Sequence, residues 1–318
     1  MTAPPALRLG TRASALATSQ SEWVADRLRA TGIEVDLVHV HTEGDTNRAS
    51  LSEIGGTGVF ASALRVALRA GDIDLAVHSL KDLPTAPEHG LLIAAVPQRE
   101  DPHDALVARD GLRLHALPGG ARVGTGSARR AAQLRQLRPD LTIQDIRGNV
   151  GTRIGYVRDG DLDAVVLACA GLSRLGRLDE VAERLPIEGM LPAPGQGALA
   201  VECREEDADL RQVLASVLEH EPTRRAVDAE RAVLRRLGAG CTAPVAAWAR
   251  LIEGSDALTL SVFVMLQDQP QRHVATGFDP AALGHDVAEH LLSRLDPVQH
   301  SGTGPAAAFT TRSHTTGA

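Results

Sequence analysis

Arginines gather in this sequence where strand-like segments run into helix-like segments. Arg12 follows the first strand-like segment, and Arg129 and Arg130 lie in the first turn of a helix-like one. Arg147 and Arg153 flank the turn before another helix-like segment. Helix N-termini attract carboxylates and phosphates through free N–H groups and the helix dipole, and a guanidinium adds bidentate recognition. Any one of these arginines alone is typical of a solvated surface, but five in such turns predict an anion-binding site.

The segment HSLKDLP, residues 78–84, carries a second candidate for chemistry. A strand-like run ends in Ser79, Lys81 and Asp82 follow, and Pro84 stops any helix. Functional groups of open α/β sheets collect at the carboxyl ends of strands. Lys81 is also the only lysine of the chain. The segment is thus typical either of a catalytic acid or base or of a Lys–Asp surface pair, and the pattern alone favours neither.

The three cysteines fit neither a disulfide framework nor a CxxC zinc site, because their number is odd and their spacing wide. Cys169 and Cys203 lie in apolar, strand-like contexts typical of buried, inert thiols. Cys241 lies in the glycine-flanked loop LGAGCTAP, where a thiolate could be reached. His39 and His41 share one face of a predicted strand, which is more typical of a surface than of a metal site. We therefore expect no metal.

Short β-branched runs alternate with amphipathic stretches, a pattern typical of α/β architecture. The pattern predicts strands at 7–11, 35–40, 73–78, 121–125, 142–146, 163–168 and 198–203. Helices are expected at 14–30, capped by Ser14, and at 59–70, 127–137, 150–158 and 205–219. The chain then changes character, with a helix at 223–237 ended by Gly238, strands at 245–251, 258–266 and 272–277, and a helix at 281–294.

Two pairs of segments resemble each other and suggest two lobes of like construction. RLGTRAS (8–14) is similar to RVGTGSA (122–128), and GDIDLAVHS (71–79) to GDLDAVVLA (160–168). Their separations differ, so this is no tandem array, and chance similarity is the alternative. We expect a discontinuous first lobe over 1–98 and 198–218 and a second lobe over 103–195. A small α+β domain over 221–296 and a disordered tail over 297–318 complete the prediction.

Composition excludes several classes of protein. The 318-residue chain has a net charge of −7 and only 2% aromatic residues, whereas nucleic-acid binders present basic, aromatic surfaces. No segment approaches the ~20 apolar residues of a membrane helix. The N-terminus lacks the basic and apolar regions of a secretory signal. We therefore expect a cytoplasmic protein without nucleic-acid or membrane partners.

In order and spacing, residues 7 to 296 closely resemble the porphobilinogen deaminase (hydroxymethylbilane synthase) family. The resemblance is carried by GTRAS, GDIDLAVHSLKDLP, EDPHDALV, VGTGSARRAAQL, LRPDL, IRGNVGTR, AGLSRLG, LPAPGQGALAVECR and AERAVLRRLGAGCTAPV. It implies two lobes like those of periplasmic binding proteins and a third, cysteine-bearing domain. It also implies a transferase of porphyrin and haem biosynthesis, which condenses four porphobilinogen molecules onto a thioether-linked dipyrromethane cofactor. Hydrolysis then releases hydroxymethylbilane, and we expect the enzyme to be a monomer.

Matched motif by motif, the resemblance makes Asp82 the catalytic aspartate and Cys241 the attachment point of dipyrromethane. It implies further cofactor contacts at Lys81, Thr125, Ser127, Arg129, Arg130, Arg147 and Gly148. Substrate contacts are implied at Arg12, Ser14, Arg147, Arg153, Arg174 and Gln196. The chain departs from the family at Glu53 and Thr57, where lysines are common, and at Gly126, which replaces a serine.

The implied chemistry explains these residue types. Loss of ammonia from porphobilinogen leaves an electrophilic azafulvene, which the α-carbon of the preceding pyrrole attacks. Positive charge develops on the pyrrole nitrogens and an α-proton leaves, so one carboxylate, that of Asp82, can stabilise the charge and move protons. A non-catalytic two-lobed carboxylate-binding protein is the alternative, but it has no use for a third domain bearing Cys241. A transcriptional regulator would need an N-terminal helix-turn-helix, whereas this chain starts with a strand.

Overall fold

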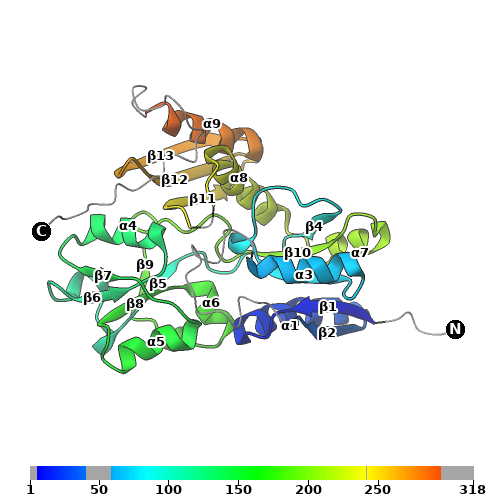
Figure 1. Ribbon diagram of the computed structural model, residues 1–318. Coiled ribbons are helices and arrows are strands. Elements are labelled where there is room, and N and C mark those ends of the chain that lie inside the picture. The colour runs from blue at the N-terminus through cyan, green and yellow to red at the C-terminus, as the bar shows by residue number, and fades with distance from the viewer. Residues whose placement is uncertain (1–5, 41–58, 241, 295–318) are drawn as a thin grey trace, which may run out of the picture.

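The computed structural model describes residues 6–40, 59–240 and 242–294. Two five-stranded sheets and one three-stranded sheet divide this part of the chain into two lobes and a smaller C-terminal unit. Figure 1 shows the C-terminal unit packed above the two lobes, which lie side by side. The predicted fold class is confirmed. No helix within the described ranges is long and apolar enough to cross a membrane.

The sheet of the first lobe has the strand order β2-β1-β3-β10-β4. Strand β1 is parallel to β2 and β3, and β10 is antiparallel to both β3 and β4. Its strands are β1 (Leu7–Thr11), β2 (Val35–His39), β3 (Leu75–Ser79), β4 (Leu91–Ala95) and β10 (Leu199–Arg204). The helices packed on it are α1 (Ala15–Arg29), α3 (Val59–Ala70) and α7 (Ala208–Leu218).

The sheet of the second lobe has the equivalent order β7-β6-β8-β5-β9, with three parallel strands followed by two antiparallel pairings. Its strands are β5 (Asp104–Ala108), β6 (Arg122–Gly124), β7 (Thr142–Gln144), β8 (Ala164–Ala168) and β9 (Glu183–Leu185). Its helices are α4 (Ala128–Leu137), α5 (Val150–Arg158) and α6 (Cys169–Arg174).

The repeated sequence segments occupy equivalent positions in the two sheets. RLGTRAS forms β1 and its turn into α1, and RVGTGSA forms β6 and its turn into α4. GDIDLAVHS ends in β3 and GDLDAVVLA ends in β8. These two strands lie beside β1 and β6 respectively. An antiparallel strand lies next to each of them, β10 beside β3 and β5 beside β8. Strand β5 begins the second lobe, whereas β10 follows the second lobe in sequence and returns to the first. The like construction expected of the two lobes is therefore present.

Some segment predictions differ from the structure. The predicted helix over 205–219 is α7, which is shorter, and the predicted strand over 142–146 ends at Gln144. Strands β4, β5 and β9 were not predicted at all. The 98–104 segment reads as a polar linker, yet Asp104 begins β5 and is fully buried. Its carboxylate is tolerated there because two arginines pair with it, as described below.

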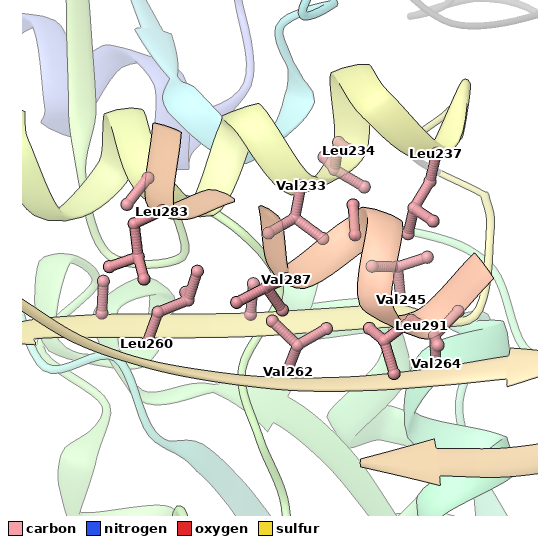
Figure 2. Packing of buried hydrophobic residues seen from close by; sticks show 14 of the residues in the cluster. Val233, Leu234, Leu237, Val245, Leu260, Val262, Val264, Leu283, Val287 and Leu291 are labelled. Carbon is pink, nitrogen blue, oxygen red and sulfur yellow. The ribbon is translucent and has the colours of Figure 1, made fainter. Parts of the chain in front are cut away.

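The C-terminal unit packs two helices on one face of an antiparallel sheet. Its elements are α8 (Glu221–Leu237), β11 (Val245–Leu251), β12 (Leu258–Leu266), β13 (Gln269–Gly277) and α9 (Pro280–Leu292). Figure 2 shows Val233 and Leu237 of α8 meeting Val287 and Leu291 of α9 above Val262 of β12. Burying each such side chain stabilises the fold by about 1.5–3 kcal/mol. As predicted, α8 ends at Gly238, which adopts the left-handed conformation at φ 59°.

Candidate functional site

The predicted catalytic segment lies at the carboxyl end of β3. Strand β3 ends at Ser79 and leads into a single 3-10 turn, Leu80–Asp82. The Leu80 N–H donates to the Ala198 carbonyl (3.0 Å), so the turn is anchored to the segment before β10. The side chain of Asp82 is exposed, and that of Lys81 is half-buried. The turn therefore presents a carboxylate to solvent beside an ammonium group that is partly withdrawn from it.

The charge environment of Lys81 joins this turn to the second lobe. Burial lowers the pKa of Lys81 to about 8. The neighbouring Asp82 carboxylate opposes this shift in pKa, and the Arg130 and Arg129 guanidinium groups add to it. The turn of the first lobe and the α4 N-terminus of the second are thus within electrostatic reach of each other.

Arg129 and Arg130 are interior residues, only 3% and 6% exposed, so they are not surface arginines. Arg129 donates from Nη1 to Asp104 Oδ2 (2.7 Å) and to the Leu191 carbonyl (2.6 Å). Arg130 donates from Nε and Nη2 to Asp104 Oδ1 (2.9 and 2.7 Å) and from Nη1 to the Val166 carbonyl (3.0 Å). The protein's own carboxylate therefore supplies part of the anion that the sequence predicted for this arginine pair.

Asp104 is a functional candidate that the sequence analysis missed. Burial alone would raise the pKa of its carboxyl, but Arg129 and Arg130 outweigh burial and hold that pKa well below its usual range. Two guanidinium groups share this single carboxylate, so the buried cluster keeps a positive charge. Gln196 is also fully buried and donates from Nε2 to Asp104 Oδ1 (2.9 Å). A buried arginine pair requires a nearby carboxylate, which is the signal that could have identified Asp104.

Arg147 and Arg153 lie around the turn before α5. Arg153 donates from Nε to the Gly148 carbonyl (2.8 Å), and burial, then Arg130 and Arg147, lowers the pKa of its guanidinium. Arg147 is exposed. Gly148 has φ +107°, and a Cβ there would lie 2.8 Å from the Thr152 side chain, so the turn requires glycine.

Three of the predicted residues cap the helices of these turns or lie beneath them. Ser14 Oγ accepts from the Ala17 N–H (3.3 Å) at the start of α1, and Ser127 Oγ accepts from the Arg130 N–H (3.4 Å) at the start of α4. Thr125 is buried, and its Oγ1 accepts from the Ser127 N–H (3.2 Å). The residues that begin these helices therefore also shape the turns that carry the arginines.

Arg12 and Arg174 lie on opposite lobes. Arg12 is half-buried in the turn between β1 and α1. Arg174, at the end of α6, donates from Nη2 to the Gly197 carbonyl (2.8 Å), and burial lowers its pKa to about 10. The Ser19 hydroxyl of α1 donates to the Arg174 carbonyl (2.7 Å), which ties the two lobes together at this point.

The charges of these turns suit a ligand with several carboxylates. The charged groups that act most strongly on Lys81 and Arg153 are the cations Arg129, Arg130 and Arg147 and the anions Asp82, Asp104 and Asp145. Within this set, Lys81 and Arg153 included, five cations face three anions. The Nε atom of Arg129 is buried without a hydrogen-bond partner among the described residues. A dipyrromethane, with acetate and propionate groups on each ring, fits such a surplus of positive charge.

Some predictions fall on residues outside the described ranges. Cys241, Glu53, Thr57 and His41 are among them. The other two cysteines are buried as predicted, and burial raises the pKa of the Cys169 thiol to about 12 and that of Cys203 to about 11. At Gly126, a Cβ would lie 2.6 Å from the Ile146 carbonyl oxygen, so a serine could be restored only if the backbone shifted.

Glu230 of α8 is a second residue that the sequence analysis missed. Its carboxylate is fully buried and accepts from Arg99 Nη1 (2.6 Å) and Nη2 (3.1 Å). It also accepts from the N–H groups of Gly195 (2.7 Å) and Ala249 (2.9 Å). Arg99 and Gly195 belong to the two segments that cross between the lobes, and Ala249 belongs to β11. One carboxylate thus joins both crossing segments to the C-terminal sheet.

Solved structures similar to this chain include two binding proteins of bacteria. A periplasmic substrate-binding protein of an ABC transporter from Coxiella burnetii has a TM-score of 0.43 and 16% identity, covering 68% of this chain and 93% of its own. A putative methionine-binding lipoprotein from Bacillus subtilis has a TM-score of 0.43 and 12% identity, covering 68% of this chain and 91% of its own. Likeness of this size adds nothing to the fold assignment above.

Comparison with protein families is more informative. Residues 7–212 match the porphobilinogen deaminase, dipyrromethane cofactor binding domain, and residues 225–293 match the porphobilinogen deaminase C-terminal domain. A porphobilinogen deaminase of Thermobifida fusca is 57% identical over 308 residues, covering 92% of this chain and 95% of its own. One from Leifsonia xyli subsp. xyli is 59% identical over 303 residues, covering 91% of this chain and 92% of its own. The family and the cofactor predicted from the sequence are confirmed, and the chain belongs to the porphobilinogen deaminase family.

Proposed function

We propose that this chain condenses four porphobilinogen molecules head to tail, with loss of ammonia, onto a covalently bound dipyrromethane. Hydrolysis then releases the linear tetrapyrrole hydroxymethylbilane. Family membership supports the reaction class. The observation that carries the proposal is the surplus of cationic side chains around the Lys81–Asp82 turn. Every added pyrrole brings two carboxylates, so the growing chain needs such a surplus.

We propose that Cys241 holds the dipyrromethane through a thioether bond. The bound group supplies a free pyrrole α-carbon to which the first substrate is joined. Its carboxylates would be held by Lys81, Arg129, Arg130 and Arg147, with Thr125, Ser127 and Gly148 shaping the turns that carry these groups. The buried ion pairs with Asp104 keep the two α4 guanidinium groups ordered before any ligand binds, which lowers the entropic cost of binding.

Asp82 is the proposed catalytic residue. Its carboxylate is exposed at the tip of the turn, where a pyrrole N–H could donate to it. There it would stabilise the positive charge that develops on the pyrrole nitrogen and would accept the α-proton that leaves after carbon–carbon bond formation. Substrate carboxylates would bind Arg12, Ser14, Arg147, Arg153 and Arg174, and Gln196 would contribute through its hydrogen bond to Asp104.

The proposed domain boundaries are 1–98 with 198–218, 103–195, and 221–296. The membership of the three sheets supports them. We also propose that the protein works as a monomer in the cytoplasm, which light scattering after gel filtration and cell fractionation would test. Free Cys169 and Cys203 suit a reducing compartment.

The decisive experiment is incubation of the purified protein with porphobilinogen. Acid oxidation of the product should give uroporphyrin, and intact-protein mass spectrometry should show an adduct of two linked pyrroles with a ladder of single-pyrrole increments above it. Cys241→Ala should lose both adduct and activity, whereas Cys169→Ala and Cys203→Ala should keep them. An active enzyme with the mass of the bare chain would refute the covalent cofactor. Porphobilinogen bound but never consumed would favour a non-catalytic binding protein.

A further inference from the structure

The turn that carries Lys81 and Asp82 has little stability of its own. It is a three-residue 3-10 helix closed by one backbone hydrogen bond, from the Leu83 N–H to the Leu80 carbonyl (3.2 Å). Hydrogen-bond geometry in such short turns is poor. Pro84 comes next and has no N–H to donate. The conformation of the turn must therefore be fixed by the elements that surround it.

Arg231 of α8 provides that support from the C-terminal unit. Its guanidinium donates from Nη1 to the carbonyls of Leu80 (3.3 Å) and Leu83 (3.0 Å) and from Nη2 to that of Pro84 (2.7 Å). Arg231 is only 7% exposed. One helical turn earlier, Val227 packs in the same buried cluster as Leu80 and Leu83. Polar and apolar contacts from one face of α8 thus act together with the hydrogen bond from the Leu80 N–H to the Ala198 carbonyl in holding the turn.

The helix that makes these contacts is itself rigidly held. Its opposite face, including Val233 and Leu237, packs against α9 and the C-terminal sheet (Figure 2). The helix ends roughly 9 Å along its axis beyond Arg231, as the rise per residue gives. Four positions after Leu237 in the sequence comes Cys241, the proposed attachment point. The same helix therefore contacts the catalytic turn and leads directly to the segment that would bear the cofactor.

We propose that Arg231 is a positioning residue for the transferase reaction: it fixes the Lys81–Asp82 turn against α8 and so sets the direction of both side chains. This inference rests on the proposed function, because it assigns Arg231 a role in that reaction. A guanidinium is planar and reaches three carbonyls at once, whereas a lysine ammonium at the same position would reach fewer. A positive charge at position 231 is therefore not sufficient to fix the turn; the guanidinium shape is needed as well.

The test compares Arg231→Lys and Arg231→Gln with Arg235→Gln as a matched control. Arg235 lies one turn further along α8, is exposed, and donates one 3.4 Å hydrogen bond to the Thr85 carbonyl. Small displacements of catalytic groups cost up to about 100-fold in rate. We expect kcat to fall by about 10- to 100-fold in both Arg231 variants with KM little changed. Arg235→Gln should keep the wild-type kcat.

A second measurement, of the Lys81 pKa, reports the conformation of the turn in the absence of substrate. Because Lys81 is the only lysine, reductive methylation with ¹³C-formaldehyde gives one side-chain signal whose NMR titration reports its pKa. The folded wild type should titrate near pH 8, as burial requires. In the Arg231 variants the released turn should let Lys81 reach water, so its pKa should rise toward the ordinary value of about 10.4. Arg235→Gln should leave it near 8.

The two measurements separate the possible failures. If the wild type forms no product, the proposed function fails, while the Lys81 titration still decides whether Arg231 holds the turn. A wild-type kcat with a Lys81 pKa near 8 in both Arg231 variants would overturn the inference. A lowered melting temperature with an unchanged kcat would overturn it too. So would a failure of both variants to fold, since Arg231 would then serve stability alone.

Discussion

Replacement of Lys81 by methionine should make the protein more stable and less active. Burial holds the Lys81 pKa near 8, whereas the unfolded chain has the ordinary lysine pKa of about 10.4. At neutral pH the folded protein therefore keeps a charged ammonium in an unfavourable place, at a cost of roughly 3 kcal/mol. Because the side chain is half-buried rather than fully enclosed, we expect Lys81→Met to gain about 1–3 kcal/mol in the free energy of unfolding.

The pH dependence gives the sharper form of this prediction. Between pH 8 and about 10.4 the unfolded chain holds a proton on Lys81 that the folded protein has released, so wild-type stability rises through this window. Below pH 8 the full cost is present, and above about pH 10.4 it has gone. The advantage of Lys81→Met should therefore be greatest at pH 7 and should disappear by about pH 10.5.

Denaturant unfolding of both proteins from pH 7 to pH 10.5 would measure this difference. The matched control is Arg135→Met, an exposed arginine on α4, which should change stability by no more than about 0.5 kcal/mol at any pH. Product formation should fall in Lys81→Met, because a carboxylate of the proposed dipyrromethane loses its ammonium partner. Equal stability of variant and wild type at pH 7, or a gain that persists unchanged at pH 10.5, would refute the reasoning.

Asp82→Asn should lower kcat by about 10²- to 10⁴-fold without changing the melting temperature, and retention of half the activity would remove Asp82 from the mechanism. Asp104→Asn should cost about 3–5 kcal/mol in unfolding free energy at pH 7, because two buried guanidinium groups lose their carboxylate. Since the folded-state pKa of Asp104 is depressed, the stabilisation by its carboxylate is complete above about pH 5 and is lost as the pH falls below about 4. Equal stability of Asp104→Asn and wild type at pH 7 would contradict this prediction. Iodoacetamide at pH 8 should label Cys169 and Cys203 only after unfolding, because burial raises their thiol pKa values to about 12 and about 11. Peptide mapping of the treated native protein would check this, and labelled Cys169 or Cys203 peptides would contradict it.

Features fixed by neighbouring residues could be predicted from the sequence. The strand 7–11, the helices 59–70 and 150–158, and the strands 245–251 and 258–266 agree residue for residue with the structure. Ser14 as an N-cap and Gly238 as a helix end were also predictable. In each case the deciding interactions are local periodicity, a capping hydroxyl or a left-handed glycine.

Features fixed by distant partners could not be predicted. Asp104 lies 25 and 26 residues from the arginines that it pairs with, and no pattern within its own segment reveals that it is buried. Glu230 sits in an arginine-rich helix, but its partners come from segments far away in the sequence. The residues alone left the Lys81–Asp82 turn undecided between a catalytic and a surface role. The assignment of Asp82 rests on resemblance to the family.

The return of β10 to the first lobe has a consequence for how the chain folds during synthesis. All strands of the second lobe lie between Asp104 and Leu185, so its sheet is complete once that stretch has left the ribosome. The first lobe begins earlier but lacks its strand between β3 and β4 until Arg204 has emerged. Domains usually fold from the N-terminus during synthesis. We therefore expect the first lobe to complete its sheet after the second lobe, with the edge of β3 unpaired until β10 is added.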